Sequence, residues 1–371
     1  MKHSLKFIPI VILAVAVFYL SFSDKPASSQ ATSQPEKNKT EEILAKLTLD
    51  QKIGQLIIGG FKGIKLNNDT KDLITRYYIG GFNFLERNIT SAKQTKSLIG
   101  EMQKLAVQHQ SLPLFTAIDQ EGGQIVRIKY LKELSAQSKI KTAAEGERVA
   151  LARGKELKNL GFNMIFSPLL DYVTNPKSYL YARSFKASPD KIKTLGNAMI
   201  RGYQKGGIVP VAKHFPGHGN VISDPHKSAK ITNTEENIKT TYDIFKNVID
   251  TSRPEVIMTA HVAITGVEDK PATLAIKIIT GKLRGELNYG GIIITDDLEM
   301  AAALGKKDIG AVAVEALLAG NDMLMLTLHP EKIPAMVSAI KKAVGEGKIT
   351  ENRINESVRK IIDLKLKVLG R

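Results

Sequence analysis

The feature that most constrains the fold is a regular alternation of short apolar runs with amphipathic stretches, which extends over most of the 371 residues. Eight runs have the composition of buried strands: 55–59, 80–84, 114–118, 163–167, 208–214, 255–261, 291–295 and 322–327. Helical patterns follow at 70–78, 92–108, 145–160, 190–205, 235–249, 278–287 and 308–319, and two more close the chain at 331–344 and 351–369. Near-continuous apolar strands that alternate with helices indicate a parallel sheet covered on its outer face.

Eight such units over about 300 residues predict an α/β fold of the closed (β/α)8 TIM-barrel type. A doubly wound open sheet is the alternative. No internal repeat or long linker interrupts the pattern, so residues 41–371 are expected to form one domain. Thr48 and Gln51 have the spacing of a capping box at the start of a first helix.

The N-terminus predicts export. Lys2, His3 and Lys6 precede an apolar run at 7–22, and a charged start with a short apolar core is typical of a secretory signal. The run is nearly long enough to span a membrane, so an uncleaved anchor is the alternative. We therefore interpret residues 1–23 as a signal peptide or signal anchor, and the polar stretch 24–40 as a flexible linker. The expected location is the periplasm, the cell surface or the medium.

Composition excludes several kinds of site. The chain has no Cys, which rules out disulfides, thiolate metal ligands and Cys nucleophiles. The formal net charge of +16 suits an anionic partner such as cell wall, although a lysine-rich solvated surface would give the same value. There is no Trp and no basic block interleaved with aromatic residues, which argues against nucleic acid. We expect a monomer without a cofactor.

Polar residues gather where the predicted strands end. They are Asp119 after the third strand, Ser167 and Asp171 after the fourth, Lys213 and His214 at the end of the fifth, His261 at the end of the sixth, and Asp296 and Asp297 after the seventh. Barrel enzymes place their catalytic groups at this C-terminal face. The pattern therefore predicts an enzyme site.

The densest of these motifs runs from Lys213 to Gly219 and continues to Asp224-Pro225-His226. Asp224 and His226 are spaced as an acid/base pair, because a carboxylate bonded to one imidazole nitrogen fixes the tautomer and leaves the other nitrogen to exchange a proton. Three His and an Asp would also suit a metal, but the helical two-histidine signature is absent. Lys213 and His214 are interpreted as ligand-holding donors or as an end-of-strand pair.

Three other motifs leave two interpretations open. Asp119 stands before a Gly-Gly turn with Arg127 beyond it, which suits hydroxyl binding or a solvated ion pair. Asp296 and Asp297 end a buried strand, where one could be catalytic and the other could face away or cap a helix. Arg183 could bind substrate oxygens with its guanidinium fork or be structural.

Together these motifs resemble glycoside hydrolase family 3, in its β-N-acetylglucosaminidase (β-hexosaminidase) branch. The resemblance extends from Leu47 to about Thr327. The matching segments are 47–56, 119–123, 166–171, 183–185, 213–219, 224–226, 259–262 and 295–300. The Lys-His-Phe-Pro-Gly-His-Gly run followed by Asp-x-His is typical of this branch rather than of the family's glucosidases. Pro225 departs from the family pattern, which usually has Ser there.

The resemblance implies roles for eight residues. Asp296 would be the nucleophile that forms a covalent glycosyl-enzyme, His226 the general acid and then base, and Asp224 the residue that orients His226. The sugar would be held by Asp119, Arg127, Arg183, Lys213 and His214. The implied activity is a retaining exo-β-N-acetylglucosaminidase acting on peptidoglycan fragments or chitooligosaccharides. A β-glucosidase or β-xylosidase, a phosphorylase of the same family, and a non-catalytic protein that binds wall glycans are the alternatives.

Overall fold

A computed structural model describes residues 34–228 and 231–369. The predicted signal or anchor, residues 1–23, lies outside the described residues. Within the described ranges, no helix combines the length and the apolar character needed to cross a membrane.

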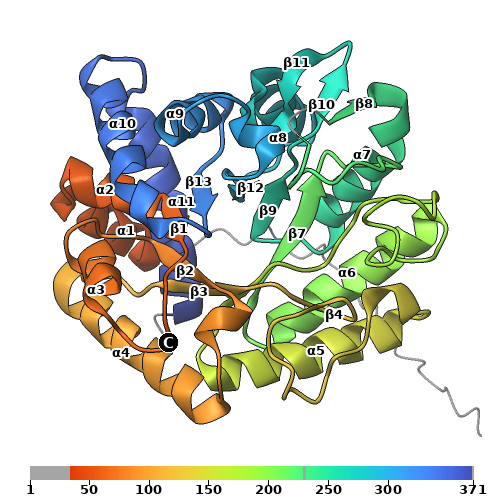
Figure 1. Ribbon diagram of the computed structural model, residues 1–371, viewed down its shortest axis with the longest axis horizontal. Helices are drawn as coiled ribbons and strands as arrows, with labels where there is room; N and C mark the ends of the chain where they lie inside the picture. The colour runs from red at the N-terminus through yellow and green to blue at the C-terminus, as the bar shows by residue number, and fades with distance from the viewer. Residues whose placement is uncertain (1–33, 229–230, 370–371) are drawn as a thin grey trace, which may run out of the picture.

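A closed barrel of parallel strands forms the centre of the molecule (Figure 1). Among the described residues its eight strands are β1 (Ile57–Gly59), β2 (Gly81–Phe84), β3 (Phe115–Ile118), β6 (Met164–Ile165), β7 (Val209–Phe215), β9 (Val256–Thr259), β12 (Ile292–Asp297) and β13 (Met323–Leu326). The strand order is β1-β13-β12-β9-β7-β6-β3-β2, and β2 pairs with β1 to close the circle. Each strand lies within or overlaps one of the eight predicted runs. The barrel is thus confirmed, and the open sheet is excluded.

Helices surround the strands as a ring (Figure 1). They are α2 (Leu49–Gln55), α3 (Asn68–Thr75), α4 (Ala92–Gln110), α5 (Ala143–Leu160), α6 (Pro189–Lys205), α7 (Glu235–Thr251), α9 (Ile309–Ala319) and α10 (Ile333–Gly345). The predicted helix at 278–287 is a π-helix, η4 (Lys277–Glu286). The capping box at Thr48 is present, since its hydroxyl accepts the Gln51 N–H and the Gln51 side chain accepts the Thr48 N–H.

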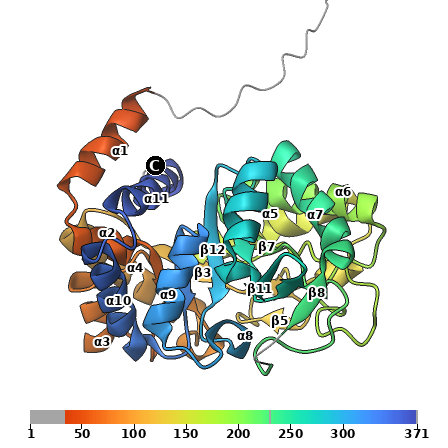
Figure 2. The ribbon, with the colours of Figure 1, turned by 90° about the horizontal axis from the view of Figure 1, so that it is seen from above.

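The linker prediction is wrong for its last part. Helix α1 (Gln34–Lys46) begins inside the 24–40 stretch and packs beside the last helix, α11 (Glu351–Leu369) (Figure 2). Thr40 is buried and its hydroxyl donates to Asp363 on α11, while Leu44 joins the hydrophobic core. The polar composition of this stretch did not predict a helix. The helix is held by its contacts with α11, which need only a few buried side chains.

Helix α11 covers the end of the barrel where the strands begin. The buried carboxylate of Asp322, which precedes β13, accepts hydrogen bonds from Ser357 (2.8 Å) and Lys360 (3.1 Å) of α11. Lys365, also on α11, is fully buried and donates to the Gln55 side chain (2.7 Å) and to the Gly80 carbonyl (2.9 Å). These contacts fasten α11 to the strand N-termini.

The opposite end carries short elements that the sequence pattern did not predict. They are the hairpin β4 (Gln120–Gly122) and β5 (Ile125–Val126), the small sheet of β8 (Thr232–Thr234), β10 (Ala263–Thr265) and β11 (Glu268–Pro271), and helix α8 (Ala301–Leu304). Figure 2 shows α8, β5 and β8 at the edge remote from α1 and α11. Of these insertions, the β4–β5 hairpin contributes Ile125 to the pocket described below, and α8 contacts the loop of His226 through the Ala302 N–H, which donates to the Pro225 carbonyl.

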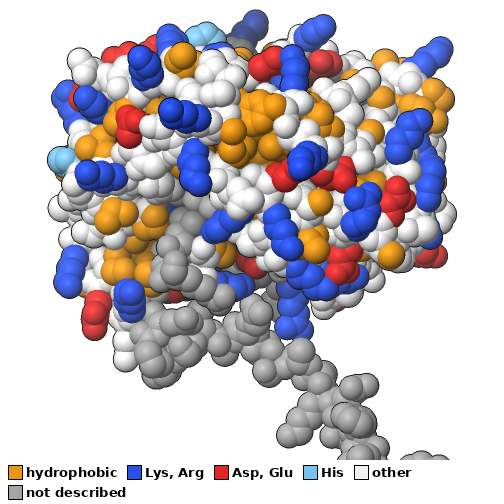
Figure 3. All heavy atoms as spheres, turned by 90° about the horizontal axis from the view of Figure 1, so that it is seen from below, with side chains coloured by type: hydrophobic (Ala, Val, Ile, Leu, Met, Phe, Trp, Pro, Cys, Tyr) orange, Lys and Arg blue, Asp and Glu red, His pale blue; other side chains and the backbone are white. Residues whose placement is uncertain are grey.

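Lys and Arg side chains on the face drawn in Figure 3 are spread among acidic, apolar and uncharged ones. The basic side chains on this face are therefore dispersed rather than gathered into one continuous patch.

Candidate active site

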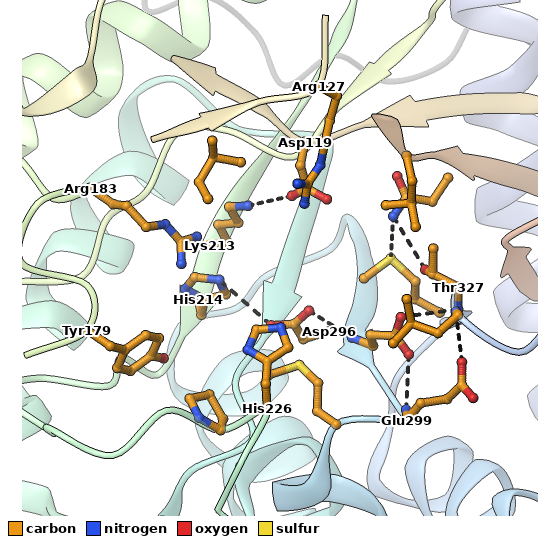
Figure 4. A pocket seen from close by; sticks show the side chains of 18 residues that line it. Asp119, Arg127, Tyr179, Arg183, Lys213, His214, His226, Asp296, Glu299 and Thr327 are labelled. Atoms are coloured by element: carbon orange, nitrogen blue, oxygen red, sulfur yellow. Dashed lines mark hydrogen bonds and ion pairs between the residues drawn. The ribbon is translucent and has the colours of Figure 1, made fainter. Parts of the chain in front are cut away.

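A pocket of about 260 Å³ opens at the C-terminal ends of the strands (Figure 4). Seven of the eight predicted site residues line it: Asp119, Arg127, Arg183, Lys213, His214, His226 and Asp296. Asp224, the eighth, is bonded to His226 beside the pocket. The structure therefore brings together residues that lie up to 177 positions apart in the chain, 119 to 296.

Asp296 is an ionised carboxylate next to the end of β12. Burial alone would raise its pKa, but His214, His261 and Lys213, which are cationic in acid, outweigh burial and lower the pKa of Asp296 to about 2. Its Oδ1 accepts the backbone N–H of Asp297 (2.8 Å), and its Oδ2 lies 3.8 Å from Nε2 of His214. An ionised, fixed carboxylate in a pocket is suited to attack an electrophilic carbon.

Asp297 has a different task. Its carboxylate accepts the backbone N–H groups of Glu299 (3.0 Å) and Thr327 (3.1 Å), and so joins the end of β12 to the loop after β13. Burial, with a smaller contribution from Glu299, raises the pKa of Asp297 to about 7. Of the two roles left open by the sequence, neither facing away nor capping a helix describes it, because Asp297 borders the pocket and ties two loops together.

His226 and Asp224 form the predicted pair. Nδ1 of His226 lies 2.8 Å from Asp224 Oδ1, which also accepts the His226 backbone N–H (3.0 Å). These two hydrogen bonds outweigh the effect of burial and lower the pKa of Asp224. The His226 side chain is 62% exposed, and in Figure 4 it lies across Asp296 from Asp119 and Arg127. Its Nε2 is thereby free to exchange a proton between substrate and solvent.

An ion-pair network holds the side of the pocket that Asp119, Lys213 and Arg183 line. Lys213 Nζ lies 3.0 Å from Asp119 and 2.7 Å from Glu121, and Arg183 binds both oxygens of Glu121 at 3.0 and 2.7 Å. Burial alone would raise the pKa of Glu121. The cations Arg183 and Lys213 outweigh burial and hold this pKa below its ordinary value. Arg183 therefore holds Glu121 in place and also lines the pocket. The Arg127 side chain lines the pocket, and its Nε is buried without a hydrogen-bond partner among the described residues.

Asp171 holds two imidazoles. Its Oδ2 accepts the backbone N–H of His214 and contacts Nδ1 of the same residue, and its Oδ1 does the same for His218. The three residues are close enough to offer one atom each to a metal ion, but each carboxylate oxygen already receives two N–H donors. Hydrogen bonding thus accounts for the cluster, and the absence of a catalytic metal stays a prediction.

His261, also at a strand end, acts on the backbone. It is buried, and burial lowers its pKa to about 4, so that it is neutral near pH 7. Its Nε2 donates to the Asp297 carbonyl at 2.9 Å. His261 thus fixes the peptide between Asp297 and Leu298, one residue beyond Asp296.

Sequence reasoning missed five residues around the pocket: Glu121, Asn83, Tyr179, Glu299 and Thr327. Glu121 was visible in the Asp119 motif, where its neighbour appeared more suited to ligands. The end of the second strand could have pointed to Asn83. Tyr179 and Glu299 lie in loops, and no local pattern marks them.

Comparison with known proteins agrees with this geometry. The model of the glycosyl hydrolase family 3 N-terminal domain matches residues 48–364. The chain belongs to glycoside hydrolase family 3. A beta-hexosaminidase A from Pseudoalteromonas piscicida is 30% identical over 330 residues, which are 81% of this chain and 55% of that relative. A beta-hexosaminidase from Alkalilimnicola ehrlichii is 29% identical over 297 residues, or 77% of this chain and 84% of the relative.

The family barrel is also found among solved structures. A family 3 beta-N-acetylglucosaminidase from Paenibacillus sp. str. FPU-7 superposes with a TM-score of 0.82 at 34% identity, covering 87% of this chain and 63% of that one. The family resemblance inferred from the motifs is thus confirmed. The chain spans about half of the first curated relative and less than two thirds of this solved structure.

Proposed function

We propose that this family 3 protein is a retaining exo-β-N-acetylglucosaminidase. The observation that carries the proposal is one pocket that joins the ionised carboxylate of Asp296 with the solvent-accessible His226–Asp224 pair. The similarity to proteins named beta-hexosaminidase and beta-N-acetylglucosaminidase supports the choice of sugar.

The geometry supports a double displacement. Asp296 attacks the anomeric carbon while protonated His226 gives its proton to the leaving glycosidic oxygen, so that the bond to the leaving group breaks and a glycosyl-enzyme forms. Neutral His226 then takes a proton from water, the water oxygen attacks the anomeric carbon, and the Asp296 carboxylate is released. Two inversions at one carbon give net retention. Asp224 stabilises the imidazolium in both steps.

The size and charge of the pocket support an exo-acting enzyme. A volume of about 260 Å³ is slightly below the range of about 300–1,000 Å³ that is usual for ligand pockets, and it suits one sugar unit. Asp119, Lys213 and Arg183 present both acceptors and donors to hydroxyl and amide groups.

The test is release of nitrophenol from the β-N-acetylglucosaminide and from the β-glucoside, each with and without phosphate. We expect hydrolysis of the first, near-background activity of Asp296→Ala, and formation of an inverted glycosyl azide when azide replaces the missing nucleophile. His226→Ala should lose activity most with poor leaving groups. An Asp296→Ala variant with full activity would overturn the assignment, and faster turnover with phosphate would identify the phosphorylase.

We also propose export, and wall fragments as the natural substrate, from the charged and apolar N-terminus and the net charge of +16. Fractionation of producing cells should place the chain outside the cytoplasm. Its recovery from the cytoplasm alone would refute export.

The predicted monomer is tested by size-exclusion chromatography. Elution at twice the chain mass would refute it.

A further inference from the structure

Three histidines around the pocket are held by the same pair of bonds. In each, the backbone N–H and ring Nδ1 contact a single carboxylate oxygen: Asp171 Oδ2 for His214 (3.0 and 2.9 Å), Asp171 Oδ1 for His218 (2.8 and 3.2 Å) and Asp224 Oδ1 for His226 (3.0 and 2.8 Å). An ionised carboxylate only accepts hydrogen bonds, so Nδ1 must carry the hydrogen in every case. Nε2 is therefore the nitrogen that can gain or lose a proton: it carries a hydrogen in the imidazolium and a lone pair in the neutral ring.

Burial separates the roles of His214 and His226. The side chain of His214 is 5% exposed and that of Asp171 is fully buried, whereas His226 is 62% exposed. Burial lowers the pKa of His214 even though Asp171 and Asp296 oppose this effect. Near pH 7, His214 is thus a neutral imidazole with its hydrogen on Nδ1 and a lone pair on Nε2.

That lone pair lies in the sugar site. Nε2 of His214 is 3.8 Å from Oδ2 of Asp296, and both groups line the pocket (Figure 4). Two acceptors therefore border the same space beside the nucleophile. A sugar hydroxyl in that space must act as a donor.

We propose that Asp171 is a positioning residue that fixes His214 in the Nδ1–H tautomer, so that His214 accepts a hydrogen bond from a sugar hydroxyl instead of donating one. The proposal rests on the proposed glycosidase function for its ligand, and it revises the sequence-based view of His214 as a donor. A free neutral histidine side chain prefers hydrogen on Nε2, so the Nδ1–H tautomer must be imposed by the protein. A substrate analogue with fluorine in place of the hydroxyl that donates to His214 cannot form this hydrogen bond, and it should be a poor substrate.

The first test observes the tautomer without any substrate. Nitrogen–hydrogen correlation spectra of ¹⁵N-histidine-labelled protein at pH 7 should contain a neutral Nδ1–H imidazole that disappears in His214→Gln. His214 observed as the Nε2–H tautomer or as an imidazolium would overturn the proposal. This result holds even if the protein proves to act on another sugar, so it separates failure of the inference from failure of the proposed function.

The second test is a double-mutant cycle between Asp171 and His214. An amide in place of the Asp171 carboxylate presents a donor to one imidazole, so Asp171→Asn should reduce kcat/KM by about 10- to 100-fold. Gln has no tautomer, and in a His214→Gln background the same change should cost only a small part of this factor. Equal losses in both backgrounds would assign Asp171 to folding alone. Asp190→Asn, at a side chain 91% exposed, is the matched control and should change neither spectrum nor rate. If Asp171→Asn does not fold, the spectrum of the parent protein still decides.

Discussion

At the residue scale, Asp296 and Asp297 show how neighbours acquire opposite chemistry. The pKa of the first is lowered to about 2 and that of the second is raised to about 7, although both are buried. The difference comes from His214 and Lys213 near one carboxylate and Glu299 near the other. Lys213 and His214 lie 83 and 82 positions before Asp296 in the chain, so the pattern Thr-Asp-Asp could mark the pair but could not say how each acid titrates.

The clearest pH effect at this scale belongs to Lys365. Burial lowers its pKa to about 7, against about 10.4 in an unfolded chain. Between these values the unfolded state binds the extra proton, so this group makes stability rise with pH, by at most about 1.4 kcal/mol per unit. Lys365→Met removes the titration while losing the bonds to Gln55 and Gly80 at every pH.

Urea unfolding of the parent and of Lys365→Met at pH 7, 8 and 9 measures this effect. The stability of the parent relative to the variant should increase over the series. A constant difference would mean that Lys365 keeps its ordinary pKa and that its site is more hydrated than the packing indicates.

At the element scale, periodicity predicted what the barrel itself requires. All eight strands and the longer helices between them could be predicted, because burial on both faces imposes apolar runs on strands. The hairpin β4–β5, the sheet β8–β10–β11 and helix α8 were not, since they are two to four residues long and are held by tertiary contacts. The hairpin directly precedes Arg127, and α8 contacts the loop of His226, so the surroundings of the site were the least predictable part.

The His226 loop is an element whose stiffness can be tested. Asp224 and Pro225 occupy the first two positions of a turn, with Lys227 N–H bonded to the Asp224 carbonyl (3.0 Å), and the Pro225 carbonyl accepts the Ala302 N–H (3.2 Å). Pro225→Gly should keep these bonds but add backbone freedom worth about 0.4–1 kcal/mol. We expect a two- to five-fold lower kcat/KM on the nitrophenyl β-N-acetylglucosaminide.

Pro113→Gly, before β3 at the other end of the barrel, is the control and should affect stability without affecting kcat/KM. If Pro225→Gly were as active as its parent, the loop would have to be positioned by its two ends alone.

At the scale of the whole molecule, the barrel has a structural end and a chemical end. Helix α11 closes the first through Asp322 and Lys365, and the pocket opens at the second. Figure 2 shows α11 at the edge opposite to α8 and β5. The sequence implied this division through polar residues at strand ends, but it could not show that α1 joins α11. That contact depends on a few side chains, among them Thr40 and Leu44.

The absence of cysteine makes this division useful for single-site chemistry. Glu356→Cys introduces one thiol on the exposed side of α11, and Leu328→Cys introduces one at the pocket rim, where the side chain is 49% exposed. A bulky maleimide polymer on the first should leave KM unchanged, and on the second it should raise KM several-fold. Similar KM values for both conjugates would contradict the placement of the pocket. The same thiol on α11 could couple the protein to a bead or electrode with every pocket directed toward the solution.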